Sequence, residues 1–113
     1  MSKGRYLGEF EHLVLLALLQ LEADGYGIAV RDLIEERTGR RVGIGSVYST
    51  LDRMQRKGWL VSTTAPPEPV RGGRTKTLYS VTTQGLQALQ ASRQMVARMT
   101  RGLDLSEAPE TGP

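Results

Sequence analysis

The stretch SVYSTLDRMQRKGWLV, residues 46–61, carries the signals that decide the fold. Three apolar residues fall on one side of a helix, because they are spaced by four and then three positions: Val47, Leu51 and Met54. The residues assigned to the opposite side are small, polar or cationic: Ser46, Ser49, Thr50, Arg53 and Lys57. Gly45 or Ser46 is predicted to cap this helix and Gly58 to end it. Residues 59–64 then have the composition of a β-strand.

Two further helices are predicted before this stretch. Residues 9–22 form the first, and its apolar side chains cover most of the circumference, as in a helix at the centre of a core. Asp24-Gly25 breaks it, and Gly25-Tyr26-Gly27 predicts a tight turn into a second helix that runs to Arg37. Apolar residues at helical spacing are predicted to face inward from that second helix: Val30, Leu33 and Ile34. Gly39 is suited to the left-handed position that follows it.

A β-hairpin and a last helix follow. Residues 77–82 are predicted to pair as a second strand with residues 59–64, and the Pro- and Gly-containing segment 65–74 forms the tip. Thr82 or Thr83 then caps a helix that runs to about Leu103. Five residues recur along it with the spacings of a heptad seam: Leu89, Ser92, Val96, Met99 and Leu103. This seam is predicted to be a dimer interface, with packing on its own subunit as the alternative.

The order of these elements predicts a mainly α-helical fold with a small β-hairpin, namely a winged helix-turn-helix followed by a C-terminal dimerisation helix. Residues 1–8 are predicted to be a flexible N-terminal arm, residues 9–82 the DNA-binding domain and residues 83–104 the dimerisation helix. Residues 105–113 are predicted to be a disordered tail. A chain of 113 residues has room for one such core.

The formal net charge of +3 conceals an uneven distribution. Residues 1–36 hold three basic and seven acidic side chains, residues 37–76 hold nine and two, and residues 77–113 hold three of each. The three segments therefore carry charges of −4, +7 and 0. A basic central segment attracts a polyanion, because cations near phosphates release condensed counterions. From charge alone, a solvated charged surface is the alternative.

Contacts with DNA are predicted on the polar side of the third helix, at the start of the second helix and on the hairpin. Ser and Thr reach base edges in a major groove without bulk, and Arg pairs there with guanine. Cations at the hairpin tip reach the sugar-phosphate chain or the minor groove. The predicted DNA-binding residues are Tyr26, Ser46, Tyr48, Ser49, Thr50, Arg53, Lys57, Arg71, Arg74 and Lys76.

Two of these residues have an alternative role in packing. Tyr48 lies between the apolar and polar sides of its helix, so it is either at the edge of the core or in contact with a phosphate. Tyr26 begins the second helix, where free backbone amides favour a phosphate. Its alternative role is an aromatic cap packed on the first helix. Trp59 and Tyr79 are predicted to belong to the core.

The sequence resembles the PadR transcriptional regulators from Leu13 to about Leu89. The resemblance is carried by LLALL (15–19), GYGI (25–28), SVYSTLDRM (46–54), GWLV (58–61) and GGRTKTLYSVTTQG (72–85). It implies a winged helix, a C-terminal dimerisation helix and repression by a homodimer that occupies inverted repeats near promoters. It also favours a phosphate contact for Tyr48. Many members carry Pro at the position of Ser49 and Leu at that of Trp59.

Enzymatic chemistry finds no support in the sequence. The chain has no Cys, which removes thiolate nucleophiles and Cys-ligated zinc. His12 is the single His, so neither a catalytic triad nor a cluster of metal ligands is present, and a surface or dimer-edge position is predicted for it. Gly72-Gly73 lies in a hairpin without the helix and Lys that follow a phosphate-binding loop. We therefore predict a non-enzyme with no catalytic residue, metal site or cofactor.

Two alternative functions are left open. A winged helix can serve as a protein-interaction module, and a basic chain can bind RNA without operator specificity. Interaction modules usually lack a cationic third helix together with a cationic wing. RNA-binding proteins that recognise sequence tend to present aromatic platforms, whereas aromatic residues make up 5% of this chain.

The predicted setting is the cytoplasm, with no membrane partner. No apolar run approaches the roughly 20 residues that span a bilayer. A small-molecule effector is left open. The resemblance implies flat aromatic ligands between the C-terminal helices of some members, but the last helix here carries Met95 and Met99 and no aromatic residue.

Overall fold

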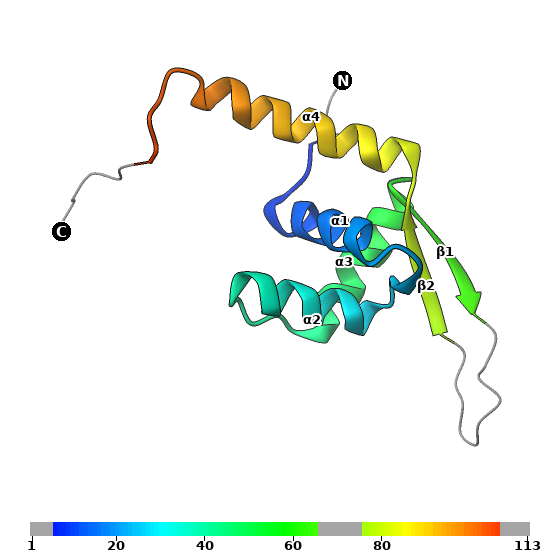
Figure 1. Cartoon of the computed structure of the whole chain (residues 1–113). Coiled ribbons are helices and arrows are strands. Elements are labelled where there is room, and N and C mark those ends of the chain that lie inside the picture. The colour runs from blue at the N-terminus through cyan, green and yellow to red at the C-terminus, as the bar shows by residue number, and fades with distance from the viewer. Residues whose placement is uncertain (1–5, 66–75, 107–113) are drawn as a thin grey trace.

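Four α-helices and a two-stranded hairpin make up the described part of the chain, residues 6–65 and 76–106, in a computed structural model (Figure 1). The elements follow in the order α1 (Glu9–Leu21), the short 3₁₀ helix η1 (Glu22–Asp24), α2 (Gly27–Thr38), α3 (Ile44–Arg56), β1 (Leu60–Ala65), β2 (Lys76–Val81) and α4 (Thr83–Thr100). The predicted mainly α-helical fold with a small β-hairpin is confirmed.

Helix α1 lies at the centre of the core. It contacts α2, α3, α4 and β2, and Figure 1 shows it between α2 and α4. Val14 and Leu15 have no exposed surface, and Ala17 and Leu18 are almost fully buried. The prediction of a central helix is confirmed, although Leu19 is 41% exposed. Within the described residues, no helix combines the length and apolar character needed to cross a membrane.

Helix α2 matches its prediction closely. Val30 and Ile34 are buried and Leu33 is partly buried against the same core. Gly39 ends the helix with φ = 72°, in the left-handed region that favours glycine, and donates its N–H to the Glu35 carbonyl at 2.9 Å. The predicted inward face and the predicted end of this helix are both confirmed.

Gly25 and Gly27 lie in the turn between η1 and α2, where neighbouring atoms leave no space for a side chain. Gly25 has φ = −79°, which any residue can adopt. A Cβ atom on Gly25 would lie 2.5 Å from the Tyr79 carbonyl oxygen, and one on Gly27 would lie 2.5 Å from the Tyr48 ring. Tyr79 also donates its N–H to the Gly25 carbonyl at 3.0 Å. The predicted turn is confirmed, and it brings β2 and α3 against the start of α2.

Helix α3 begins earlier than predicted and buries one residue that was assigned to its polar side. Gly43 occupies the N-cap position, so Ser46 lies inside the first turn and caps nothing. Thr50 is only 5% exposed, together with fully buried Val47, Leu51 and Met54. The outward placement of Thr50 is therefore wrong. It lies three residues after Val47 and four before Met54, and these are the spacings of one helix face.

The hairpin pairs in antiparallel register from Leu60 opposite Val81 to Ala65 opposite Lys76. Each strand is displaced by one residue from its predicted range, and Trp59 lies just before β1, buried in the core as predicted. Tyr79 is partly buried against the same core. The predicted hairpin tip, with Arg71 and Arg74, lies outside the described residues.

Thr82 connects the hairpin to α4. Its hydroxyl donates to the Gly58 carbonyl at 2.7 Å and accepts the Gly85 N–H at 3.0 Å, so it caps the helix and also fixes the start of the hairpin. Of the two caps considered from the sequence, Thr82 is the one used. The helix ends at Thr100, three residues before the predicted Leu103.

The N-terminal segment that precedes α1 is attached to α4. Leu7 donates its N–H to the Ser92 hydroxyl at 3.0 Å, and Gly8 donates its N–H to the Glu11 carboxylate at 2.8 Å. The described end of the predicted flexible arm, residues 6–8, is therefore held by the fold. Residues 1–5 of that arm and residues 107–113 of the predicted tail lie outside the described part of the chain.

Candidate nucleic-acid interface

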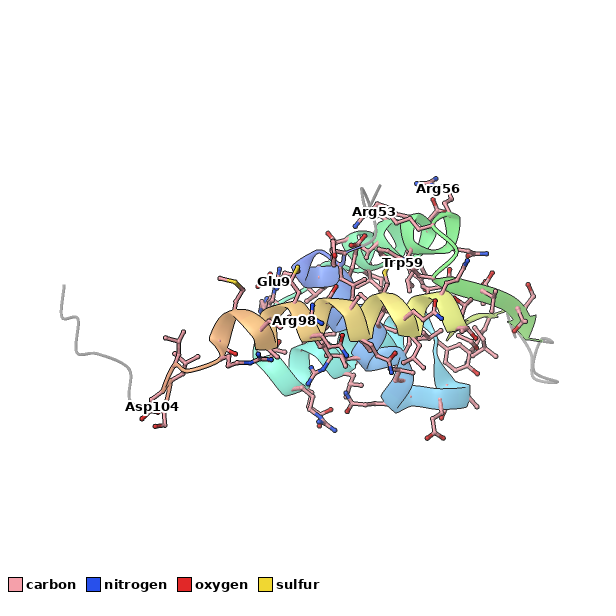
Figure 2. All side chains as sticks on the ribbon, turned by 90° about the horizontal axis from the view of Figure 1, so that it is seen from above. Glu9, Arg53, Arg56, Trp59, Arg98 and Asp104 are labelled. Atoms are coloured by element: carbon pink, nitrogen blue, oxygen red, sulfur yellow. The ribbon has the colours of Figure 1, made fainter. Side chains whose placement is uncertain are left out.

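The outward face of α3 is polar. Its centre lies opposite the buried stripe, and four exposed residues with spacings of four, three and four define it: Gly45, Ser49, Asp52 and Arg56. Arg56 pairs with Asp52 at 2.8 Å. Sequence reasoning missed Arg56, although its spacing from Ser49 and Asp52, opposite the apolar stripe, was the signal that could have found it. Arg53 and Arg56 extend on the same side of the molecule in Figure 2.

Ser46, Arg53 and Lys57 lie on the flank of α3 that faces α1. Arg53 Nε and Lys57 Nζ each lie 3.2 Å from Glu11 Oε2. The ammonium group of Lys57 also lies 4.7 Å from the centroid of the Trp59 ring, within range of a cation–π interaction. The side chain of Arg53 is 45% exposed and that of Lys57 is 33% exposed. Both cations are therefore held by the protein and still reach solvent.

The Glu11 carboxylate stays ionised at neutral pH. Burial on its own raises the pKa of Glu11, but the hydrogen bonds from the Gly8 N–H, Arg53 and Lys57 outweigh it. The net pKa of Glu11 lies below its ordinary value. A buried acid beneath two cations of α3 had no signal in the sequence, since Glu11 is separated from Arg53 by 42 residues.

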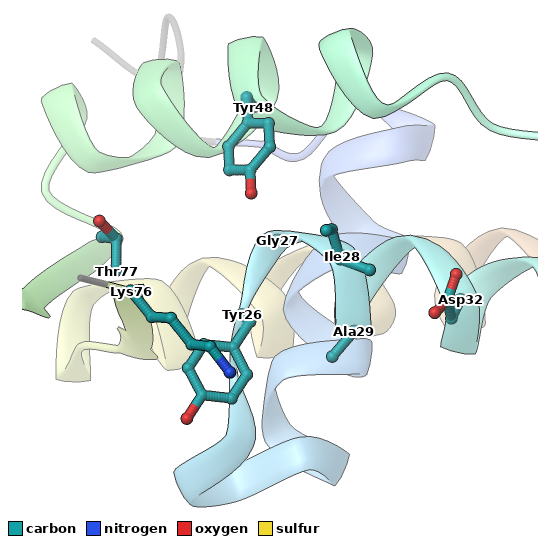
Figure 3. A pocket seen from close by; sticks show the side chains of 8 residues that line it. All are labelled: Tyr26, Gly27, Ile28, Ala29, Asp32, Tyr48, Lys76 and Thr77. Carbon is teal, nitrogen blue, oxygen red and sulfur yellow. The ribbon is translucent and has the colours of Figure 1, made fainter. Parts of the chain in front are cut away.

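A groove of about 540 Å³ lies between the start of α2, α3 and the start of β2 (Figure 3). Tyr26, Tyr48 and Lys76 line it, together with Asp32 and Thr77. Tyr48 is 44% exposed, although its ring closes over Gly27, and Lys76 Nζ lies 4.9 Å from the centroid of the Tyr26 ring. The structure thus brings together three predicted DNA-binding residues from three elements, with both tyrosines partly packed and partly accessible.

Two further cations precede α3 and were missed as individual site residues. Arg40 and Arg41 line a smaller groove of about 300 Å³ with Phe10 and Ser46. Arg40 pairs with Glu9 at 2.9 Å and its guanidinium lies 5.5 Å from the Phe10 ring centroid. Both residues belonged to the basic central segment, so the charge distribution was the signal that could have found them.

The predicted seam of α4 divides into two halves. Leu89 and Ser92 are 4% and 3% exposed and pack within their own subunit, so their assignment to a dimer interface is wrong. Val96, Met99 and Leu103 are 55%, 77% and 62% exposed. Leu89, Ser92, Val96 and Met99 share one side of α4, whereas Leu103 lies beyond the end of the helix at Thr100, so its place in the predicted helical seam is wrong. The core covers only the first half of the helix, and Figure 1 shows the second half extending beyond the other helices.

No group of three or more His, Asp or Glu side chains gathers within residues 6–65 and 76–106. His12 is half-buried on α1, and its pKa is lowered by burial and by the charge of Arg93. His12 therefore lies half-buried at the surface of α1, close to the charge of Arg93.

A helix-turn-helix formed by α2 and α3, followed by a hairpin, places the chain in the winged helix-turn-helix class of proteins. The chain belongs to the PadR-like family of transcriptional regulators, whose family model matches residues 15–91. The resemblance identified from the sequence motifs is therefore confirmed. No similar sequence was found among curated proteins.

Solved structures agree with this assignment. The chain is 26% identical to H. salinarum RosR in the hsRosR-S4 complex structure, with a TM-score of 0.65 over 95% of this chain and 82% of that chain. It is 25% identical to a PadR family transcription regulator from Clostridium difficile, with a TM-score of 0.67 over 82% and 95%. A PadR family regulator from Eggerthella lenta shares the fold at 24% identity and a TM-score of 0.65, over 83% and 81%.

Proposed function

We propose that this protein is a homodimeric repressor that binds an inverted repeat in double-stranded DNA through α3 and the hairpin. The observation that carries the proposal is the polar surface of α3, where small and cationic side chains are exposed opposite a fully buried apolar stripe. The one acid on this surface, Asp52, is paired with Arg56. Such a helix fits a major groove, in which Ser reads base edges and Arg pairs with guanine. Repression is inferred from the resemblance to PadR regulators.

The residues proposed to contact DNA fall into two groups. Ser46, Ser49 and Arg53 of α3 are proposed to face the major groove, together with the newly identified Arg56. The second group is proposed to contact the sugar-phosphate chain: Tyr26, Tyr48, Lys57 and Lys76, joined by Arg40 and Arg41, and also Arg71 and Arg74, which lie outside the described residues. Backbone contacts fix the register and base contacts determine sequence preference. Thr50 is buried and is proposed only to support α3 from within.

The partner of α4 is proposed to be a second copy of this chain. The support is the continuity of one helix face, since Leu89 packs in the core whereas Val96 and Met99 on the same side remain exposed. Leu103, just beyond the end of the helix, is exposed as well. Large apolar residues in one stripe mark an interaction surface. A two-fold axis through this stripe would present two α3 helices to one duplex, as an inverted repeat requires. The proposed setting is the cytoplasm.

Selection from a pool of random DNA duplexes tests the proposal against a protein-interaction module and an RNA-binding protein. We expect the protein to enrich one duplex sequence, and about a hundredfold excess of the same sequence as single-stranded DNA or RNA should not displace it. Transcription from a promoter that overlaps the selected site should fall when the protein is added. Absence of enrichment would favour an interaction module, and equal competition by RNA would favour an RNA-binding protein. Either result contradicts the proposal.

A further inference from the structure

Glu11 is the one charged residue among the described residues that is buried, at 5% exposure. It lies on α1, beneath the flank of α3. Its Oε1 atom accepts the Gly8 N–H at 2.8 Å, and its Oε2 atom accepts hydrogen bonds from Arg53 Nε and Lys57 Nζ at 3.2 Å each. One fixed carboxylate is therefore shared between two cations that belong to the proposed DNA-binding helix.

Arg53 and Lys57 each make further contacts with the protein, on the side that faces the core. Arg53 donates a second hydrogen bond from Nη2 to the hydroxyl of buried Thr50 at 3.4 Å, and Lys57 stacks on Trp59. A guanidinium has five N–H groups in a rigid fork, so contacts with Glu11 and Thr50 leave others directed to solvent. The side chain of Arg53 is thus oriented before any ligand arrives.

Glu11 differs from the other acids that pair with cations near α3. The carboxylates of Glu9 and Asp52, which pair with Arg40 and Arg56, are 80% and 64% exposed, whereas that of Glu11 is 6% exposed. Exposed pairs are screened by salt and contribute little. A buried acid with a backbone donor is screened much less and keeps its geometry.

The position of Glu11 is also linked to α4. Leu7, which precedes the Gly8 donor, is attached to the Ser92 hydroxyl. The path from Ser92 through Leu7, Gly8 and Glu11 to Arg53 joins α4 to α3 by hydrogen bonds and one peptide link. The carboxylate therefore cannot move with Arg53 toward DNA without breaking bonds on its own side.

We propose that Glu11 is a positioning residue that sets the sequence selectivity of α3, an inference that rests on the proposed DNA-binding function. Glu11 holds Arg53 in the orientation that a base edge requires, which reduces the entropy lost on specific binding. It also neutralises part of the charge of Arg53 and Lys57, which weakens their attraction to phosphates of any sequence. Glu11 therefore strengthens the preference for the correct duplex and lowers binding to random duplex.

Glu11→Gln tests this inference, with Glu9→Gln as the matched control. Each substitution removes one negative charge from α1 and releases an arginine of the same surface. Equilibrium binding is measured on the duplex selected by the wild-type protein and on a scrambled duplex. For Glu11→Gln, we expect affinity for the scrambled duplex to rise, its salt dependence to steepen by roughly one contact per protomer, and the ratio of the two affinities to fall roughly tenfold. For Glu9→Gln, we expect both affinities to rise by the same small factor and the ratio to stay unchanged.

Two further variants separate positioning from general stability. In the background Arg53→Ala with Lys57→Ala, adding Glu11→Gln should leave the ratio unchanged, because the groups through which Glu11 acts are absent. Arg53→Lys keeps the charge but loses the fork, so the ratio should fall while the salt dependence stays near that of the wild type. If Glu11→Gln does not fold, Arg53→Lys still tests the inference, because an unchanged ratio would show that the orientation of Arg53 does not set the selectivity.

Equal ratios for Glu11→Gln and Glu9→Gln would overturn the inference while leaving the proposed function intact. A wild-type protein that binds the selected and scrambled duplexes equally would instead contradict the proposed function itself. The two failures are therefore distinguishable in one set of measurements.

Discussion

A chain that carries Val96→Glu and Met99→Glu is expected to sediment as a folded monomer. Both side chains are mostly exposed in one subunit, so the substitutions should leave the winged helix and its melting temperature nearly unchanged. In the proposed dimer, four carboxylates would meet across one seam and lose their hydration without a partner. Sedimentation of the variant and of the wild type measures the change directly.

The same variant should bind its selected duplex about 10²–10⁴-fold more weakly, because the two half-sites would no longer be joined in one ligand. Binding to a scrambled duplex should change much less. Gln90→Glu with Gln94→Glu is the matched control. It adds the same charge to exposed positions on the opposite side of α4 and should remain a dimer. An unchanged dimer in the Val96 and Met99 variant would assign this surface to another role.

Raising the salt concentration from about 50 to 200 mM is expected to weaken duplex binding by about 10³–10⁵-fold, the range for six to ten phosphate contacts. Within the described residues, each protomer exposes five cations on α3 or next to one of its ends: Arg40, Arg41, Arg53, Arg56 and Lys57. Cations that bind phosphates release condensed counterions, and added salt opposes this release. Titrations of a fluorescent duplex at several salt concentrations measure the slope.

The oligomeric state of the protein is the control for the salt dependence of DNA binding. The proposed α4 seam is apolar, so sedimentation at the same salt concentrations should show the same dimer. A loss of affinity can then be attributed to the DNA contacts. An affinity that stays flat over the whole range would remove DNA as the main partner of the basic surface.

Elements with strong local signals could be predicted from the sequence. The stripe of Val47, Leu51 and Met54 defined α3, and Gly39 and Gly58 both adopt the left-handed conformation expected at helix ends. Thr82 provides the capping hydroxyl of α4. Each signal depends on a residue and its neighbours within about one or two helical turns, which is the range over which such patterns act.

Features that depend on tertiary packing could not be predicted. Thr50 is polar and was placed outward, but the core surrounds it. The heptad spacing of α4 identified one face correctly but could not show that the core covers Leu89 and Ser92 and leaves Val96 exposed. Glu11 gave no signal, because its partners on α3 are 42 and 46 residues away in the sequence. Local spacing defines a face, whereas what covers that face depends on the whole fold.

Footprinting on the selected duplex tests most directly the claim that two α3 helices related by a two-fold axis bind one inverted repeat. We predict two equally protected half-sites whose centres lie roughly 34–36 Å apart, or a near multiple, with two protomers bound per duplex. Scrambling one half-site should remove protection from both, since neither half alone would retain the dimer at the same protein concentration. A single asymmetric protected segment, fully occupied by one protomer, would contradict the account.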